Sequence, residues 1–511
     1  MSGRGGAGSE PRGATSARRA GAGPDATHPG APSLGSRALR GSVWAVVGHG
    51  TSLVIRLGSN LILTRLLFPD AFGLMAIVYA FLAGLAMFSD LGLAPSIVQG
   101  SRGDDPRFLD TAWTLQIARG VGLFAFSCLL ASPLAAFYGQ PLILGLLPAA
   151  GFGVLIAGFN STSLPRLQRH LAVAKLTLVE LSAQISGVAV TLGWALIHPT
   201  VWALVGGGLA SASVTLALSR TVVADRRDRL AWNRDSARDL FHFGKWIFVS
   251  TVLAFLVGQS DRLIFGKLTS VATLGVYSIA SMFAMLPSGV VHRVGIAVVF
   301  PAFSRKTESM TGFESAFRRS RRPLLAFGGL IVACLGASGP PLIEVLYDPR
   351  YAEAGWILQL LAIEGWFQIL EVPYGSALLA LGLPRWLAVA NALKLAGILA
   401  LVPLGFWLYG FPGAIGGFAI SEALRYAACI AGARRQGLLG AGGDLLASAL
   451  VAIAAGCGLY ASFAIGEAGG ESFERLAGAL LTASLAWLPV AYFLLRKEAA
   501  RLAADLGFRL R

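Results

Sequence analysis

The chain has 511 residues, of which 55% are hydrophobic and only 14% are charged, and its formal net charge is +15. The mean hydropathy of +0.66 does not fit a soluble domain, in which roughly 25% of residues are charged. The composition therefore excludes an ordinary soluble protein. It also argues against nucleic-acid binding, because no compact soluble basic domain is present to bind an acidic polymer.

Residues 1–40 are rich in Gly, Ala, Ser, Pro and Arg and contain no apolar run of the kind that a signal peptide needs. We expect them to form a disordered cytoplasmic tail. The four cysteines lie far apart in apolar segments, at Cys128, Cys334, Cys429 and Cys457. They predict neither a disulfide framework nor a metal site, and we expect no cofactor.

Apolar segments of about 20 residues follow the tail, without the alternation that is typical of barrel strands. We predict about 14 transmembrane helices, at residues 43–66, 71–93, 112–136, 142–163, 176–197, 201–219, 244–264, 274–298, 324–345, 354–382, 387–409, 411–431, 445–465 and 476–495. The predicted fold class is an all-α polytopic membrane protein. Two parallel six-helix bundles would surround a central cleft, with two further helices at the C-terminus.

Basic loops and tails divide these helices into units. We expect a disordered tail at 1–40, an N-terminal bundle at 41–220, a basic cytoplasmic linker at 221–243, a C-terminal bundle at 244–432, two additional helices at 444–495 and a basic tail at 496–511. A second basic loop is expected from Ser304 to Arg322.

The basic residues predict the orientation of the chain. Of the 42 Lys and Arg residues, 32 lie in the tails and loops on the N-terminal side of the predicted membrane, and four lie in the opposite loops. The positive-inside rule then places both termini in the cytoplasm, in a bacterial plasma (inner) membrane. The opposite loops are very short, and the longest, Gly466–Arg475, has ten residues. They leave little room for the catalytic loops of a membrane glycosyltransferase or polymerase, so we expect no enzyme.

An internal repeat supports the division into two bundles. The stretch Leu61–Ile77 aligns without gaps with Leu263–Ile279 at a constant offset of 202 residues, which pairs Gly73 with Gly275. Both units begin on the cytoplasmic side, so the repeats should be parallel and related by an axis along the membrane normal. Rocking one bundle against the other would expose the cleft to each face in turn.

Several motifs in these hairpins carry a family resemblance. The run Leu63-Thr-Arg-Leu-Leu-Phe-Pro-Asp-Ala-Phe-Gly-Leu74 and the later Asp261-Arg-Leu-Ile-Phe-Gly-Lys267 resemble equivalent hairpins of polysaccharide-repeat-unit flippases. These form the Wzx-like, exopolysaccharide-exporter branch of the multidrug/oligosaccharidyl-lipid/polysaccharide (MOP) flippase superfamily. The likeness covers roughly residues 40–440. One departure is Arg262, where relatives commonly carry Asn.

The resemblance implies a function as well as a fold. It implies translocation of undecaprenyl-diphosphate-linked oligosaccharide repeat units from the inner to the outer leaflet, for exopolysaccharide, capsule or O-antigen (lipopolysaccharide) assembly. The lipid-linked oligosaccharide and the membrane lipids would be the direct partners. A polysaccharide polymerase and assembly proteins would be further partners.

Six cations lie inside or at the lip of apolar segments, where charges are costly and usually functional: Arg56, Arg119, Arg262, Arg293, Lys394 and Arg425. In the first helix His49, Ser52, Arg56, Ser59 and Asn60 share one face, which should line the cleft. A guanidinium binds phosphate oxygens bidentately. We therefore predict that Arg56, with His49 and Asn60, contacts the diphosphate or the sugars. The alternative is that Arg56 pairs with a neighbouring helix and holds the bundle together.

Three other cations lie about one to two turns inside the cytoplasmic edge: Arg119, Arg293 and Lys394. Cations at that depth would suit the loading of a diphosphate from the inner leaflet. Snorkelling to the headgroups is the rival interpretation for Arg119 and Arg293. For Arg425 the preferred interpretation is an intrahelical ion pair with Glu422.

The tenth predicted helix carries Glu364, Gln368 and Glu371 on one face. Two carboxylates at mid-membrane could exchange protons, bind Na⁺ or neutralise cations across the cleft. Asp261 and Arg262, near the outer end of the seventh helix, form either a gate or a structural pair, and we prefer the structural pair. These five residues are the candidates for coupling or gating.

No enzyme or ATPase motif is present, so transport must draw on a gradient. The membrane potential acting on the diphosphate and an antiport of H⁺ or Na⁺ are both open. Two other functions suit the same fold. A multidrug or organic-cation antiporter would have an acidic, aromatic cleft, and a lipid II flippase would share the cationic one.

Overall fold

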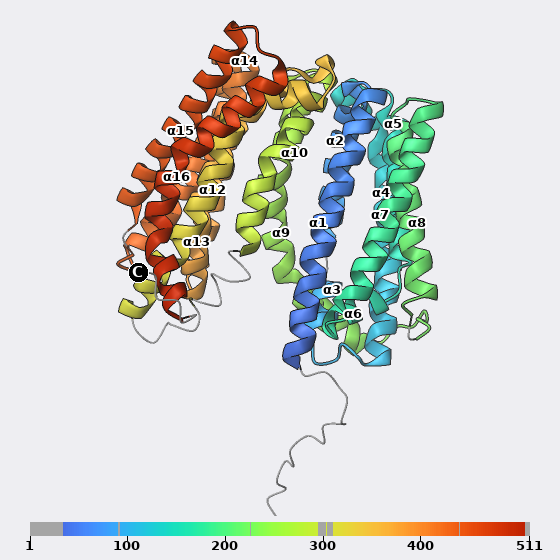
Figure 1. Cartoon of the computed structure of the whole chain (residues 1–511). Coiled ribbons are helices and arrows are strands. Elements are labelled where there is room, and N and C mark those ends of the chain that lie inside the picture. Colours follow the sequence, from blue (N-terminus) through green and yellow to red (C-terminus); the bar gives the residue numbers. More distant parts are fainter. Residues whose placement is uncertain are drawn as a thin grey trace, which may run out of the picture.

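The computed structural model describes residues 34–89, 92–224, 226–294, 303, 310–438 and 440–505. Within these ranges every regular element is a helix, which confirms the all-α fold class (Figure 1). Ten described helices are long and apolar enough to cross a membrane, or eleven if the bent pair α5–α6, with an angle of 63°, counts as one span. The protein is therefore a multi-pass membrane protein.

The N-terminal half packs as one group of helices. Its elements are α1 (Leu34–Leu66), α2 (Pro69–Phe88), α3 (Leu93–Gln99), α4 (Pro106–Tyr138), α5 (Ile143–Gly158), α6 (Ser163–Arg169), α7 (Val173–Ile197) and α8 (Trp202–Thr221). Helix α4 packs on α5, both α5 and α7 pack on α8, and α1 packs on α7. Tight turns join the long helices, because Pro69 starts α2 and Gly139, at φ 64°, ends α4 in the left-handed conformation that favours glycine.

The C-terminal half contains α9 (Arg234–Leu268), α10 (Val271–Val294), α12 (Met310–Leu346), the short 3₁₀ helix η2 (Pro349–Tyr351), α13 (Ala354–Ala380), α14 (Arg385–Arg434), α15 (Ala441–Glu467) and α16 (Ser472–Asp505). Helix α12 packs against α13, α15 and α16, and α13 packs against α14. Gly410 interrupts α14 with φ 64° and ψ −147°. The chain reverses there and brings Gly405 against Gly413, so α14 contains the two helices predicted at 387–409 and 411–431.

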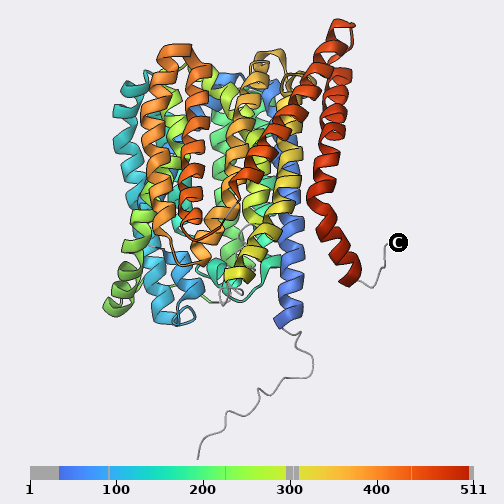
Figure 2. The ribbon, with the colours of Figure 1, turned by 90° about the vertical axis from the view of Figure 1, so that its left-hand side faces the viewer.

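The two halves lie side by side, and α9 and α10 are the helices of the C-terminal half that face the N-terminal half (Figure 1). Helix α10 packs against both α2 and α13, and α9 packs against α2, α4 and α14. Helices α15 and α16 stand at one edge of the molecule (Figure 2). The start of α1 and the end of α16 lie at the same end of the molecule. We call this end the inner end and the opposite end the outer end.

Three helices begin earlier than the sequence predicted. Helix α1 begins at Leu34, so residues 34–40 are helical and not part of a disordered tail. Helix α9 begins at Arg234, inside the expected linker, and α12 begins at Met310, inside the expected loop. These extensions are polar and carry arginines, so a search for apolar segments misses them. Helix propensity does not depend on apolarity, and Arg, Leu and Ala are all good helix formers.

Two predicted helices are broken in the structure. The segment predicted at 71–93 contains α2 and the start of α3, and Gly92 precedes α3 at φ 63°. The segment predicted at 142–163 ends as α5 at Gly158 and turns into the short α6. Helices α3 and α6 pack together at the inner end. The predicted disorder of residues 1–33 and the end of the basic tail at 506–511 lie outside the described residues.

Candidate functional site

Hydrogen bonds join the two halves at the outer end. The hydroxyl of Tyr347, which directly follows α12, donates to Asn60 Oδ1 of α1 at 3.0 Å, and the Tyr351 hydroxyl donates to the Leu67 carbonyl at 3.1 Å. Between them, Arg350 donates to the carbonyl of Arg65 at 3.2 Å. The turn after α12 is therefore fastened to the outer end of α1.

A matching set of contacts joins α4 to α9. The Tyr138 hydroxyl donates to the Leu263 carbonyl at 3.2 Å, and Lys267 donates to the Phe137 carbonyl at 2.5 Å. Lys267 also lies over the Phe137 ring. Arg65 and Lys267 are equivalent positions of the internal repeat. We call both sets together the outer contact; its residues are Asn60, Arg65, Leu67, Phe137, Tyr138, Leu263, Lys267, Tyr347, Arg350 and Tyr351.

The polar face of α1 makes hydrogen bonds with both halves of the molecule. Ser52 donates to Gln184 Oε1 at 2.6 Å, and Gln184 Nε2 donates back to the Ser52 carbonyl at 2.8 Å, which ties α1 to α7 of its own half. Eight residues later, Asn60 binds Tyr347 of the other half. Arg56 lies between them, one turn from each. Its side chain is exposed, and it makes no hydrogen bond or ion pair with the described residues.

Two adjoining cavities lie in the N-terminal half. His49 and Ser52 line a cavity of about 280 Å³ with Glu180 of α7, and Glu180 also lines an adjoining cavity of about 470 Å³ beside Tyr79. The Glu180 carboxylate makes no ion pair within the described residues, although it lies in a helix long and apolar enough to span a membrane. The predicted residue His49 therefore shares a cavity with a carboxylate, about two turns before Arg56.

Arg119 lines a third cavity, of about 420 Å³, near the inner end. Its guanidinium donates to the Ser89 hydroxyl at 2.8 Å and to the Ala86 carbonyl at 2.6 Å. Both acceptors lie at the C-terminal end of α2, where carbonyl groups lack helical partners and a cation is favoured. Arg119 thus caps α2, and its side chain is half-buried. Arg293 lies in α10, and its side chain is outside the described residues.

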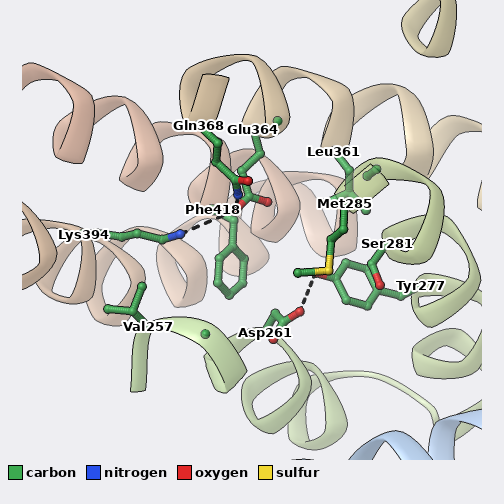
Figure 3. A pocket seen from close by; sticks show the side chains of 13 residues that line it. Val257, Asp261, Tyr277, Ser281, Met285, Leu361, Glu364, Gln368, Lys394 and Phe418 are labelled. Atoms are coloured by element: carbon green, nitrogen blue, oxygen red, sulfur yellow. Dashed lines mark hydrogen bonds and ion pairs between the residues drawn. The ribbon is translucent and has the colours of Figure 1, made fainter. Parts of the chain in front are cut away.

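A cavity of about 130 Å³ lies in the C-terminal half among α9, α10, α13 and α14 (Figure 3). The Lys394 ammonium approaches Glu364 at 3.7 Å from across this cavity. Gln368 donates to Glu364 at 3.2 Å, and the Tyr277 hydroxyl donates to Asp261 at 3.0 Å. The cavity is therefore lined by two carboxylates and one cation.

Further ion pairs adjoin this cavity. Lys394 also pairs with the fully buried Glu422. Arg425 bridges Glu422 at 3.0 Å and Glu371 at 3.2 Å. The predicted intrahelical pair of Arg425 with Glu422 is thus confirmed. Glu364 and Glu371 also pair with cations, but these belong to α14 of the same half, and the predicted neutralisation across the cleft is not seen among the described residues.

Asp261 and Arg262 complete the charged cluster. Their charged groups lie 4.0 Å apart, and Arg262 also donates to Gln259 at 2.9 Å. The cluster then holds four carboxylates, Asp261, Glu364, Glu371 and Glu422, against three cations, Arg262, Lys394 and Arg425. Its formal charge is −1. Lys394 is buried and paired, whereas the sequence predicted an open cation there.

The partner Glu422 was not assigned to Lys394 from the sequence. The two residues are 28 positions apart, on opposite arms of the hairpin that turns at Gly410. Lys394 lies 16 residues before this turn and Glu422 lies 12 residues after it, so the two arms hold them at similar depths. That spacing is the signal that could have identified the pair.

The comparisons with known proteins place the chain in a family. Residues 62–355, more than half of the chain, match the family described as polysaccharide biosynthesis protein. The chain belongs to this family. The matched region begins in α1 and ends in α13, so it includes part of the charged cluster and every residue of the outer contact except Asn60.

Two bacterial proteins resemble about two thirds of the chain. The succinoglycan biosynthesis transport protein ExoT of Rhizobium meliloti is 23% identical over 336 residues, 65% of this chain and 67% of the relative. The lipopolysaccharide biosynthesis protein WzxC of Escherichia coli is 22% identical over 355 residues, 68% of this chain and 71% of the relative. The predicted membership of a Wzx-like branch is confirmed. The relatedness to a transport protein also supports the prediction of a transporter in place of an enzyme.

Solved structures share the fold of this polysaccharide biosynthesis family member. The lipid II flippase MurJ in an inward closed conformation matches with a TM-score of 0.70 and 12% identity, over 89% of this chain and 99% of MurJ. An inward-facing multidrug resistance transporter of the MATE family matches with a TM-score of 0.60 and 14% identity, over 76% of this chain and 94% of that protein. The expected MOP superfamily fold is thereby confirmed.

Proposed function

We propose that the protein is a flippase that moves undecaprenyl-diphosphate-linked oligosaccharide repeat units from the inner to the outer leaflet of the bacterial plasma (inner) membrane, for exopolysaccharide, capsule or O-antigen assembly. Membership of the polysaccharide biosynthesis family and relatives named for succinoglycan and lipopolysaccharide biosynthesis support this substrate class. Both termini would lie in the cytoplasm, as the distribution of Lys and Arg requires. A polysaccharide polymerase and assembly proteins would act next to it.

The observation that carries the proposal is the open guanidinium of Arg56. A diphosphate carries about two negative charges, and each of its polar groups would cost several kcal/mol in bare hydrocarbon. Arg56 sits on a polar face of α1 between Ser52, which is bonded to its own half, and Asn60, which is bonded to the other. A cation held there can bind phosphate oxygens while the prenyl chain stays in lipid. His49, Asn60, Arg119, Arg293 and Lys394 are the further substrate-binding candidates.

These candidates differ in how ready they are to bind an anion. Arg56 is exposed, whereas Lys394 is buried between Glu364 and Glu422. A diphosphate could engage Lys394 only after displacing those carboxylates. Arg119 retains a half-exposed side chain above a cavity while it caps α2. We therefore propose that Arg119 and Arg56 act as successive contacts, and that Lys394 belongs to the coupling cluster.

Transport would proceed by alternating access. The outer contact closes the outer end through Tyr138, Tyr347, Lys267 and their partners. Opening it requires loss of these hydrogen bonds, each with a net stability of roughly 1 kcal/mol. A few such bonds are weak enough for a bound substrate to shift the equilibrium and strong enough to keep the empty protein closed outside.

Two sources of energy are compatible with the cluster in the C-terminal half. A negative-inside potential favours outward movement of an anion by about 2.3 kcal/mol per charge per 100 mV, so that a diphosphate with two charges gains about 4.6 kcal/mol at 100 mV. Alternatively, the cavity that holds Glu364 and Asp261 takes up H⁺ or Na⁺, because the cluster has one more carboxylate than cations. The charge balance of the cluster would then change as the helices move, through the contacts of Gln368, Glu371 and Arg262 with their charged neighbours.

The direct test is complementation of a bacterial strain that lacks its own repeat-unit flippase. The chain should restore surface polysaccharide, and the Arg56→Ala variant should not. Parallel strains test the alternatives: a strain depleted of its lipid II flippase, and a drug-sensitive strain without its multidrug exporters. Growth of either of these strains, together with failure in the first, would overturn the proposed substrate.

A further inference from the structure

A cavity of about 470 Å³ lies within the N-terminal half, among α1, α2, α7 and α8. A single water molecule needs roughly 10–15 Å³, so this cavity has room for a group much larger than one bound ion. It shares Glu180 and Gln184 with the adjoining cavity of about 280 Å³, which also contains His49. The roles proposed above use His49 and leave Glu180 without a task.

Three polar side chains from three helices line the larger cavity: Tyr79 of α2, Glu180 of α7 and Ser211 of α8. Within the part of the chain that the structure describes, no side-chain oxygen of these residues takes part in a hydrogen bond or an ion pair. A carboxylate accepts hydrogen bonds, whereas a hydroxyl both donates and accepts them. The set therefore suits a ligand that carries several hydroxyl groups.

The charge of the cavity argues against other ligands. None of the described residues that line it is Lys, Arg or His, so the charge of Glu180 is not balanced by the cavity wall. A phosphate or a second carboxylate would be repelled, and the repulsion is strong where little water separates the charges. A lone cation would leave most of the volume empty. A neutral polar group fits both the charge and the size.

The rest of the wall is apolar and offers flat surfaces. The Tyr79 side chain is 48% exposed, and Ala183, Gly187 and Gly208 line the cavity with little or no side chain. Ligand sites commonly combine apolar and aromatic walls with a few placed polar groups. A sugar ring matches this combination, because it carries hydroxyls at its rim and C–H groups on its faces.

The cavity adjoins the level of Arg56. Helices α1 and α7 both run from the inner to the outer end (Figure 1), and Ser52 is bonded to Gln184. Arg56 lies one turn beyond Ser52, and Val188, which lines the cavity, lies one turn beyond Gln184. The open guanidinium and the cation-free cavity are therefore at similar depths. A diphosphate at Arg56 would place the sugar attached to it near this cavity.

We propose that this cavity binds the sugar attached to the diphosphate, and that Glu180 selects a neutral sugar over an acidic one. This inference rests on the proposed function, because it takes the lipid-linked oligosaccharide as the ligand. Glu180 accepts hydrogen bonds from ring hydroxyls, Ser211 and the Tyr79 hydroxyl bind others, and the Tyr79 ring covers one face. An acidic sugar would bring its own carboxylate toward that of Glu180.

Binding to the full-length protein in detergent tests the sugar site. The two probes are undecaprenyl diphosphate that carries one neutral hexose and undecaprenyl diphosphate alone. The wild type should bind the hexose-bearing lipid at least tenfold more tightly. Glu180→Ala and Tyr79→Ala should lose most of this difference and still bind the bare lipid at least as tightly as the wild type. Ser182→Ala, at an exposed position of α7 outside the cavity, is the control and should change neither affinity.

A third probe, undecaprenyl diphosphate that carries a uronic acid, tests the selection by charge. The wild type should bind it at least tenfold more weakly than the hexose-bearing lipid. Glu180→Gln keeps much of the shape and hydrogen bonding of the side chain but not the charge, so it should reduce this preference to less than threefold. An unchanged preference in Glu180→Gln would overturn the selective role of Glu180.

The bare lipid separates failure of this inference from failure of the proposed function. Equal affinities of the wild type for the hexose-bearing and bare lipids would overturn the sugar site and leave the flippase proposal standing. Binding of neither lipid by the wild type would overturn both. Equal losses in Glu180→Ala and Ser182→Ala would also overturn the sugar site, and a thermal unfolding curve for each variant confirms that folded proteins are compared.

Discussion

Gly73 and Gly275 make reciprocal contacts at the place where α2 crosses α10. A Cβ atom on Gly73 would overlap the carbonyl oxygen of Val271, and a Cβ atom on Gly275 would overlap the carbonyl oxygen of Pro69. Pro69 and Val271 are 202 residues apart in the chain, and Gly73 and Gly275 are separated by the same 202 residues. Each half thus offers the other the same surface, as expected for parallel repeats related by an axis along the membrane normal.

This crossing predicts that neither glycine tolerates a side chain. Gly73→Ala and Gly275→Ala should each lower the stability of the protein in detergent by about 1–3 kcal/mol, because the obstacle is backbone and cannot rotate away. The change is measured as a lower apparent Tm and as reduced complementation. Gly416→Ala in α14 is the control, since nothing lies within 4 Å of its added methyl group. Equal Tm values for the Gly73 and control variants would contradict the close crossing.

The outer contact should set the balance between closed and open outer ends. Tyr138→Phe with Tyr347→Phe removes one hydrogen bond from each side, at 3.2 and 3.0 Å. At roughly 1 kcal/mol each, the pair of changes should shift the equilibrium toward the open outer end by about 30-fold, since 1.4 kcal/mol is tenfold. Labelling of a cysteine introduced at Ser59, which lies on the polar face of α1 but takes no part in the outer contact, by an impermeant maleimide reports the shift.

Tyr409→Phe provides the matched control for this experiment. Tyr409 lies beside the outer turn at Gly410 and is 76% exposed, and its hydroxyl makes no hydrogen bond with the described residues. Its loss should leave the labelling rate unchanged. If all three tyrosine changes accelerate labelling equally, the outer contact does not hold the two halves together.

Much of this architecture follows from the sequence, because burial in a bilayer imposes length and apolarity on every crossing segment. The hairpin at Gly410 and the equivalence of Gly73 with Gly275 could both be read from the chain. The polar starts of α9 and α12 could not, since they lie beyond the apolar stretches. The tyrosine contacts of the outer end could not be predicted either, because they join residues that are 125 to 287 positions apart in the chain.

The charged cluster predicts that loss of Lys394 lowers the stability of the protein and that a second substitution restores it. Among the described residues, Lys394→Met leaves the buried Glu422 with Arg425 as its one remaining cationic partner and leaves Glu364 without one. Removal of one member of a buried ion pair typically costs 3–5 kcal/mol. The double variant Lys394→Met/Glu364→Gln should therefore recover much of the lost stability, measured as apparent Tm.

Transport by that double variant distinguishes two roles of Lys394. If the lysine only balances the carboxylates, activity should return together with stability. A protein that is stable but inactive would instead identify Lys394 as a direct substrate contact. The sequence alone favoured that direct contact, because it showed the cation and did not show its partner on the other arm of the hairpin.

Energy coupling through the same cluster predicts different responses to two gradients. In proteoliposomes, Glu364→Gln should abolish acceleration by a pH gradient and preserve acceleration by voltage, because the amide cannot exchange a proton while the substrate keeps its charge. Glu471→Gln, at an exposed loop position, is the control and should respond to both. Unchanged acceleration by the pH gradient in the Glu364 variant would exclude this carboxylate from proton coupling.

Substitution of Arg56 tests substrate binding directly, because it breaks no side-chain hydrogen bond or ion pair within the described residues. It has no ion-pair partner among the described residues, so its loss should cost little stability, unlike the loss of Lys394. Arg56→Lys keeps the charge but not the planar fork, and should retain a part of the activity. Arg65→Ala is the matched control, because Arg65 contributes its backbone carbonyl to the outer contact.

The decisive measurement is the initial rate of movement of an undecaprenyl-diphosphate-linked oligosaccharide across proteoliposomes that contain the wild-type protein, Arg56→Ala or Arg65→Ala. We predict transport by the wild type and by Arg65→Ala, and a rate at least tenfold lower for Arg56→Ala at an unchanged apparent Tm. Equal rates for the wild type and Arg56→Ala, or no movement of the glycolipid by the wild type, would contradict the proposed route along α1.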